Sequence, residues 1–195
     1  MRIVVSEFTT LDGVMEAPQE WSLPYWTEEI EKFKHEELIT TDVQLFGRVT
    51  YEEFAKAWTS QTDEVGFAER MNNLPKYVVS KKLKQAEWNN STIIKRNIEE
   101  EISKLKEQTG SDILVAGSGK LVSFLIEHDL VDEYRLLVHP IVVGKGKRLF
   151  PDRQAASLLL TESRTFDSGV TLLRYEPAKK YEPEKQEEVL TRPAG

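Results

Sequence analysis

Short apolar runs rich in β-branched residues alternate along this chain with segments of helical periodicity, and this alternation limits the folds available to it. Strands are predicted over residues 2–8, 42–46, 75–80, 91–95, 112–116 and 132–143, and helices over 27–40, 47–58, 62–72, 97–109 and 119–128. Two last apolar runs, 157–166 and 170–177, flank an Asp-Ser-Gly turn, the pattern of a β-hairpin. The sequence therefore predicts one α/β domain over residues 1–178, with a mostly parallel sheet and an antiparallel edge, and a polar, mobile tail over 179–195.

The composition excludes several classes of protein and of site. The chain has 26 Lys and Arg against 33 Asp and Glu, and a net charge of −7 argues against a general nucleic-acid binder. It has no cysteine, and His35, His128 and His139 lack the spacing of ligands on one helix, so no metal site is expected. A polar N-terminus and the lack of any membrane-length apolar stretch predict a cytoplasmic protein that does not bind a membrane.

A glycine turn joins a predicted strand to a predicted helix in the segment LVAGSGKLVSFLI, residues 114–126. Leu114 and Leu121 stand where a P-loop needs Gly and Ser or Thr, and Val122 stands where a dinucleotide fingerprint needs its third glycine. The physical chemistry of the turn still suits a phosphate, because small residues allow close approach and a helix start offers free N–H groups. A tight turn without a ligand is the alternative.

Two other predicted strands end in the same way. Gly47 is followed by Arg48 and Thr50 at a helix start, and Ser80 is followed by two lysines, the first of them Lys81. Each set also has a structural explanation, as a helix cap or as solvated surface residues. Because ligands of open α/β sheets bind at the carboxyl ends of the strands, three such ends favour a ligand with separated phosphates, such as NADPH.

Five segments in order carry a resemblance to a known family: VVSEFTTLDG, LFGRVTYE, PKYVVSKKL, DILVAGSGKL and DLVDEYRLLVHPIVVGKGKRLF. Over roughly residues 1–176 the chain resembles the dihydrofolate reductase-like superfamily, and it looks closest to the RibD C-terminal domain, the reductase domain of riboflavin biosynthesis. The resemblance implies a three-layer fold with a mixed central sheet between helices, and an NADPH-dependent reductase that forms a homodimer.

The resemblance also implies a role for each candidate residue. The pyrophosphate and 2′-phosphate of NADPH are expected at Gly47, Arg48 and Thr50, the 2′-phosphate also at Ser80 and Lys81, and the pyrophosphate at Gly117, Ser118, Gly119, Lys120 and Leu121. Val5 and Ser6 are expected to pass the nicotinamide, and the Leu11-Asp12-Gly13 turn to border nicotinamide and substrate.

The catalytic acid is where the chain departs from dihydrofolate reductases. After a Trp-x-Leu-Pro segment those enzymes carry an acid, whereas Trp26 stands here, and Glu28 is the nearest candidate. Asp12 is the other catalytic candidate and is also expected to contact substrate. Trp21, Trp26 and Phe33 are expected to line a pocket for a flat ring, with ordinary core packing as the alternative.

The predicted substrate is a small molecule with a pyrimidine- or pterin-like ring. The expected chemistry is that of a 5-amino-6-(5-phosphoribosylamino)uracil reductase, and a dihydrofolate reductase-type pterin reductase is an alternative. A non-catalytic NADPH-binding module is a third possibility, because the helix acid is missing.

Overall fold

Residues 1–150 and 156–178 are described in a computed structural model of the protein. The elements are β1 (Arg2–Thr10), α1 (Glu28–Ile39), β2 (Thr41–Gly47), α2 (Arg48–Trp58), α3 (Phe67–Asn73), β3 (Lys76–Val79), β4 (Ser91–Ile94), α4 (Ile98–Glu107), β5 (Asp112–Val115), α5 (Gly119–Glu127), β6 (Glu133–His139), β7 (Leu158–Thr165) and β8 (Thr171–Pro177). Two 3-10 turns, Pro18–Glu20 and Leu23–Tyr25, lie between β1 and α1. None of the helices in this described part is long and apolar enough to cross a lipid bilayer.

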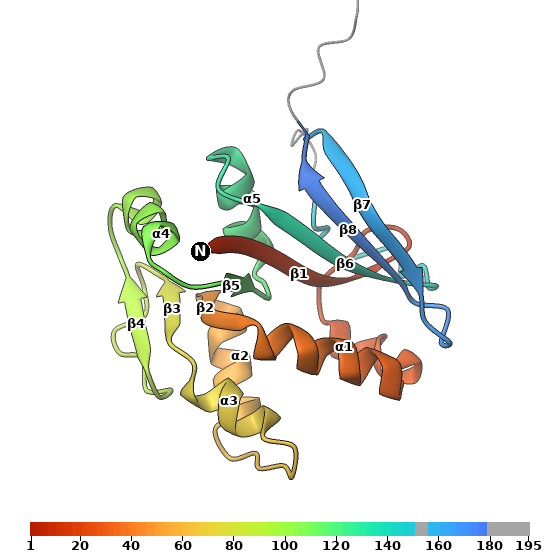
Figure 1. The fold of residues 1–195 in the computed structure, drawn as a ribbon, viewed down its shortest axis with the longest axis horizontal. Coiled ribbons are helices and arrows are strands. Elements are labelled where there is room, and N and C mark those ends of the chain that lie inside the picture. Colours follow the sequence, from red (N-terminus) through yellow and green to blue (C-terminus); the bar gives the residue numbers. More distant parts are fainter. Residues whose placement is uncertain (151–155, 179–195) are drawn as a thin grey trace, which may run out of the picture.

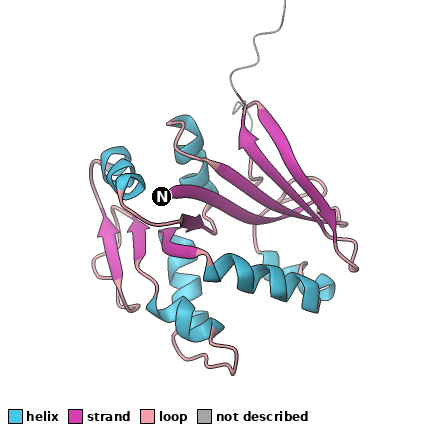
Figure 2. Ribbon diagram, in the orientation of Figure 1, coloured by secondary structure: helices cyan, strands magenta, loops and turns pink. Residues whose placement is uncertain are grey.

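The strands form one mixed sheet in the order β4-β3-β2-β5-β1-β6-β8-β7 (Figure 1). The strands from β4 to β6 pair in parallel, whereas β8 runs antiparallel to both β6 and β7. Helices α1, α2 and α3 cover one face, and α4 and α5 cover the other (Figure 2). The mixed, mostly parallel sheet and its antiparallel hairpin are confirmed.

The alternation of side chains along β1 explains how both faces are filled. Ile3 and Val5 point into a cluster with α4 and α5, and Phe8 packs with a second cluster under α1. Because both faces of the parallel part are covered by helices, its strands are nearly continuous apolar runs.

The sheet opens at the carboxyl end of β1. The pairing of β1 with β5 ends at Val5 and Val115, whereas the pairing of β1 with β6 continues to Thr10 and His139. Along residues 6–9 the β5 side of β1 therefore faces no strand of the described chain, and at Thr10 the N–H group donates to the Val14 carbonyl at 2.9 Å. The carboxyl ends of strands are where α/β sheets bind their ligands, so this edge is the candidate ligand site.

Two boundaries differ from the sequence prediction by about four or five residues, and the others by at most about two. The strand predicted over 132–143 ends at His139, because Pro140 has no N–H group for the ladder. The helix predicted over 62–72 begins only at Phe67, because the carboxylate of Asp63 accepts bonds from the N–H groups of Phe67 and Ala68 and turns the chain there. The predicted tail lies outside the described residues, and the domain boundary at 178 stays a prediction.

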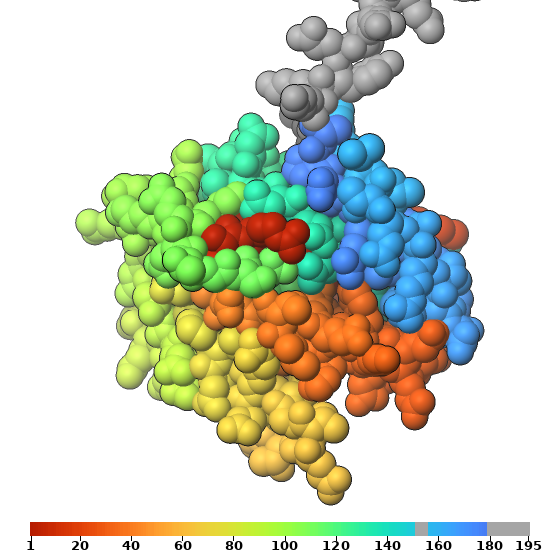
Figure 3. Space-filling view, in the orientation of Figure 1, coloured from red at the N-terminus to blue at the C-terminus, as the bar shows by residue number. Residues whose placement is uncertain are grey.

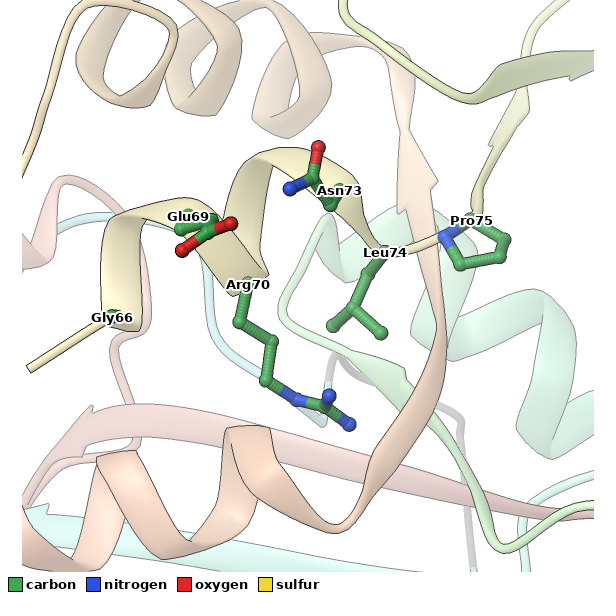
Figure 4. A pocket seen from close by; sticks show the side chains of 6 residues that line it. All are labelled: Gly66, Glu69, Arg70, Asn73, Leu74 and Pro75. Atoms are coloured by element: carbon green, nitrogen blue, oxygen red, sulfur yellow. The ribbon is translucent and has the colours of Figure 1, made fainter.

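A shallow pocket beside α3 lies far from the carboxyl edge, next to Pro75 at the amino end of β3 (Figure 4). The Arg70 guanidinium extends from α3 and donates hydrogen bonds to the carbonyl groups of Leu38, Ile39 and Thr41, each at 2.7 Å. Leu38 and Ile39 end α1 and Thr41 begins β2, so this side chain has a structural role in closing the connection between the two elements.

A network of charged side chains is buried between the sheet and α1. Arg135 of β6 pairs with Glu37 at 3.3 Å, Asp112 at 3.1 Å and Glu133 at 2.6 Å. Arg2 pairs with the last two acids at 3.0 Å each, where the amino end of β1 reaches the surface (Figure 3). Burial by itself would raise the pKa of Glu37, but the nearby Lys34 and Arg135 hold this pKa below its usual range.

Candidate active site

The two glycine turns after β2 and β5 lie directly against each other. The Gly47 N–H group donates to the Gly117 carbonyl at 3.4 Å. A Cβ atom on Gly47 would lie 2.2 Å from Ser118 Oγ, and one on Gly117 would lie 2.8 Å from Thr50 Oγ1. Only glycine permits this contact, so the starts of α2 and α5 are held side by side at the carboxyl edge.

Both helix starts leave N–H groups available to an anion. No side chain caps α2 at Gly47 or α5 at Ser118. The exposed Lys120 adds a positive charge at the start of α5, and Met15 lies against Gly119. Free N–H groups together with the positive end of the helix dipole favour a phosphate. The sequence-predicted residues of these two turns are therefore brought together, although their contact with a cofactor stays a prediction.

The cations predicted for the phosphates occupy two places. Arg48 pairs with Glu52 at 2.6 Å on the surface of α2. Lys81 lines a cavity of about 590 Å³ next to the start of α4. The hydroxyl group of Ser80 accepts bonds from the N–H groups of Lys82 and Leu83, so it closes the turn after β3.

Two further cations of this cavity, Lys95 and Arg96, were missed by the sequence reasoning. They follow β4 as Lys81 and Lys82 follow β3, so the same pattern of cations after a strand marks them. Phe124 and His128 of α5 complete one wall of the cavity. These two rings are stacked, with centroids 4.0 Å apart, and Glu99 and Glu100 also line the cavity. The rings and the three cations suit an aromatic ring that carries a phosphate.

Three of the predicted cofactor residues have buried side chains. Val5 and Leu121 belong to the core cluster under α4 and α5. The Ser6 hydroxyl donates to a Glu37 carboxylate oxygen at 3.0 Å and accepts from Lys34 Nζ at 3.0 Å. The Leu121 N–H group already donates to the Ser118 carbonyl at 2.8 Å, and Val5 pairs with both β5 and β6. The contact of these residues with a cofactor stays a prediction.

Asp12 ties its turn to a distant loop. Its carboxylate accepts bonds from Thr10 Oγ1 at 2.6 Å, from the Gly144 N–H group at 2.8 Å and from the Val143 N–H group at 3.2 Å. These donors, Thr10 first, lower the pKa of Asp12 to about 2. The carboxylate is ionised and cannot release a proton at neutral pH, while the backbone of Gly13 follows it in the left-handed region, at φ 80°. Its contact with substrate stays a prediction.

The other predicted acid and the aromatic residues are dispersed. Glu28 is exposed in the first turn of α1. Trp21 is buried against His139, with ring centroids 5.0 Å apart, and Trp26 is 44% exposed beside Phe8. Phe33 instead packs in the core below α1. The structure brings Trp21 and Trp26 near one another through Phe8 and His139, and it does not bring Phe33 to them.

Glu7 is a buried acid at the carboxyl edge of the sheet, and the sequence reasoning missed it. It is only 7% exposed, and its Oε1 atom has no hydrogen-bond partner. Burial raises the pKa of Glu7 to about 8, and the Gly117 backbone and Lys34 oppose this rise only in part. The sequence signal was present, because Glu7 shares a strand face with the core residues Ile3 and Val5. No cluster of three His, Asp or Glu in residues 1–150 and 156–178 could hold a metal ion.

Comparison with known proteins supports the same fold and family. The family model of the RibD C-terminal domain matches residues 2–172. The uncharacterised protein YyaP of Bacillus subtilis (strain 168) is 32% identical over 181 residues, which cover 89% of this chain and 94% of that protein.

Two solved structures share the fold at low identity. One is the diaminohydroxyphosphoribosylaminopyrimidine deaminase/5-amino-6-(5-phosphoribosylamino)uracil reductase of Thermotoga maritima, with a TM-score of 0.67 at 16% identity, covering 91% of this chain and 56% of that one. The other is dihydrofolate reductase of Enterococcus faecalis complexed with NADP(H), with a TM-score of 0.60 at 17% identity, covering 91% of this chain and 97% of that one. The ordered strand ends, the paired glycine turns and the family match together establish that this chain belongs to the RibD C-terminal domain family, with its dihydrofolate reductase-like fold.

Proposed function

We propose that this protein is an NADPH-dependent reductase whose cofactor lies at the carboxyl edge of the sheet. The observation that carries the proposal is the contact between the Gly47 and Gly117 turns, which sets two uncapped helix starts beside the unpaired edge of β1. A pyrophosphate needs such a cradle of N–H groups. The NADP(H) complex of the Enterococcus faecalis fold relative supports this choice of ligand.

Each part of the edge has a task in this proposal. The starts of α2 and α5 bind the pyrophosphate, and Lys81, Lys95 and Arg96 bind the adenosine 2′-phosphate in their cavity. The backbone edge of residues 6–9 that faces no strand orients the nicotinamide. When bound, NADPH supplies a hydride, and the protein supplies binding and orientation.

The proposed substrate presents a C=N bond in or beside a pyrimidine- or pterin-like ring. A ribosylamine presents this bond when its sugar ring opens to the imine. The Thermotoga maritima enzyme, which shares the fold, supports reaction on 5-amino-6-(5-phosphoribosylamino)uracil as the first candidate. A pterin is the second candidate. A homodimer and a cytoplasmic location also stay predictions, and the molar mass in solution measures the first of them.

The cations of the cavity should make the protein bind NADPH more tightly than NADH. Lys81→Ala and Arg96→Ala should each weaken NADPH binding roughly 10- to 100-fold, because each removes a charged hydrogen bond worth about 1.5–3 kcal/mol. NADH binding should stay unchanged, since NADH has no 2′-phosphate. Quenching of tryptophan fluorescence measures both affinities.

Lys32→Ala is the matched control, because this lysine of α1 is 78% exposed and away from the cavity. Equal losses of affinity for NADPH and NADH would show that the cavity does not bind the 2′-phosphate. Failure of the wild-type protein to bind either nucleotide would exclude the reductase. Binding without oxidation of NADPH by any C=N substrate would instead favour a non-catalytic module.

A further inference from the structure

Reduction of a C=N bond requires a proton as well as a hydride, so the site needs an acid that is protonated near neutral pH. The acids around this edge differ sharply in this respect. Asp12 is ionised and held by three donors, and Glu29 accepts bonds from Arg164 and the Asp167 N–H group on the surface. Glu37 is buried but paired with Lys34 and Arg135.

Glu7 differs from all of these acids in both position and partners. It lies in the half of β1 that extends beyond the pairing with β5, at the proposed cofactor site on the carboxyl edge of the sheet. Its carboxyl group is near the Gly117 backbone, in the turn that starts α5. Its Oε1 atom is buried and has no partner, although a buried polar atom ordinarily has one.

The surroundings of Glu7 favour a neutral carboxyl group. The charged side chains that act on it are Lys34 and Glu37 of α1, which pair with each other and so largely cancel. From the β5–α5 turn only a backbone group acts on it. A buried acid without a cation of its own keeps its proton, and a free oxygen beside a ligand site is the arrangement of a general acid.

We propose that the Glu7 carboxyl group is the proton donor of this reductase, positioned beside the nicotinamide at the carboxyl end of β1. In the reaction a C–H bond forms with the hydride supplied by NADPH, and an N–H bond forms with the proton of Glu7. The C=N double bond becomes a single bond, NADPH is oxidised to NADP⁺, and the Glu7 carboxylate regains a proton from solvent. This inference rests on the proposed reductase function and identifies the proton donor that the reaction requires.

The first test needs no substrate. Carbon-13 NMR of protein labelled at the glutamate side-chain carboxyl should show one resonance that titrates near pH 8 and is absent from Glu7→Gln. Saturating NADP⁺ should lower the midpoint of this titration by at least half a pH unit relative to saturating NADPH. The reason is that the oxidised nicotinamide ring is positively charged and favours the carboxylate. Equal midpoints with the two nucleotides would overturn the position beside the ring.

The second test separates proton donation from binding. Glu7→Gln keeps the size and neutrality of the side chain but cannot release a proton. It should bind NADPH within threefold of wild type, yet oxidise NADPH with 5-amino-6-(5-phosphoribosylamino)uracil or dihydrofolate roughly 100- to 10,000-fold more slowly. The wild-type rate should fall above pH 8, and Glu7→Gln should lose this pH dependence.

Glu31→Gln serves as the control, because this acid of α1 is exposed and no partner of its side chain is described. A Glu7→Gln rate within threefold of wild type would overturn the proposal while leaving the reductase intact. If the wild-type protein bound neither NADPH nor NADP⁺, the proposed reductase function would be wrong, and this inference would be wrong with it. If neither compound were turned over, the NADP⁺ and NADPH titrations would decide the matter alone.

Discussion

Replacing Gly117 by alanine is expected to lower the free energy of unfolding by about 2–5 kcal/mol and to weaken NADPH binding more than tenfold. Gly117 has φ of +86°, where an L-residue costs roughly 1–2 kcal/mol. Its new Cβ atom would also lie 2.8 Å from Thr50 Oγ1, and such overpacking costs about 1–3 kcal/mol more. The two glycine turns must then separate, and the proposed phosphate cradle opens.

Gly66→Ala provides the matched control for this result. Gly66 has φ of +76°, but no atom lies within 4 Å of the position that its Cβ would take. It should therefore show the cost of the backbone conformation alone, without any loss of NADPH affinity. Denaturant unfolding and nucleotide titration measure the two effects. Equal destabilisation by the two alanines would show that the turns do not depend on their close contact.

Replacing Arg135 by methionine should lower the free energy of unfolding by about 3–5 kcal/mol at pH 7, the largest loss of stability expected here. The substitution leaves Glu37, Asp112 and Glu133 buried, with Asp112 and Glu133 retaining only Arg2 as a cationic partner. Removing one partner of a buried ion pair is costly because the remaining charge cannot be hydrated. Arg164→Met is the control, because its pair with Glu29 is exposed and is expected to contribute at most about 1 kcal/mol.

The loss of unfolding free energy in Arg135→Met should become smaller as pH falls. In the wild-type protein the folded-state pKa of Glu37 is lowered, so the stability from this ion pair is present above pH 4.5 and is lost as pH falls through the folded value. In the variant the carboxyl groups of Glu37, Asp112 and Glu133 each have one cationic partner fewer, so less of the variant's stability depends on their ionisation. The gap between the two proteins should therefore narrow from pH 7 to pH 4. A constant gap over that range would contradict the role of the charges.

Most of the fold could be predicted because the determinants are local. Hydrophobic periodicity and turn residues gave each helix and strand, and the alternation of the two gave the parallel sheet. The errors also have local causes that compete with periodicity. Pro140 ends β6 early, and Asp63 bonds to backbone N–H groups and delays α3.

The candidate site could be predicted only in part. The glycine turns were visible, since strand, glycine and helix follow one another along the chain. Lys95 and Arg96 share a cavity with Lys81 because β3 and β4 pair, and that pairing brings together residues that are not adjacent in sequence. The task of Asp12 depends on a loop more than a hundred residues away.

The sequence by itself determined the family, the element order and the small residues at the strand ends, because these depend on neighbours in the chain. Only the tertiary structure decided which polar groups are ionised and which are available. Asp12 and Glu7 both precede α1, yet three donors stabilise the charge of Asp12, whereas burial without a cation of its own keeps Glu7 neutral. Charge state follows from desolvation and from partners, and a chain acquires both only when distant segments pack together.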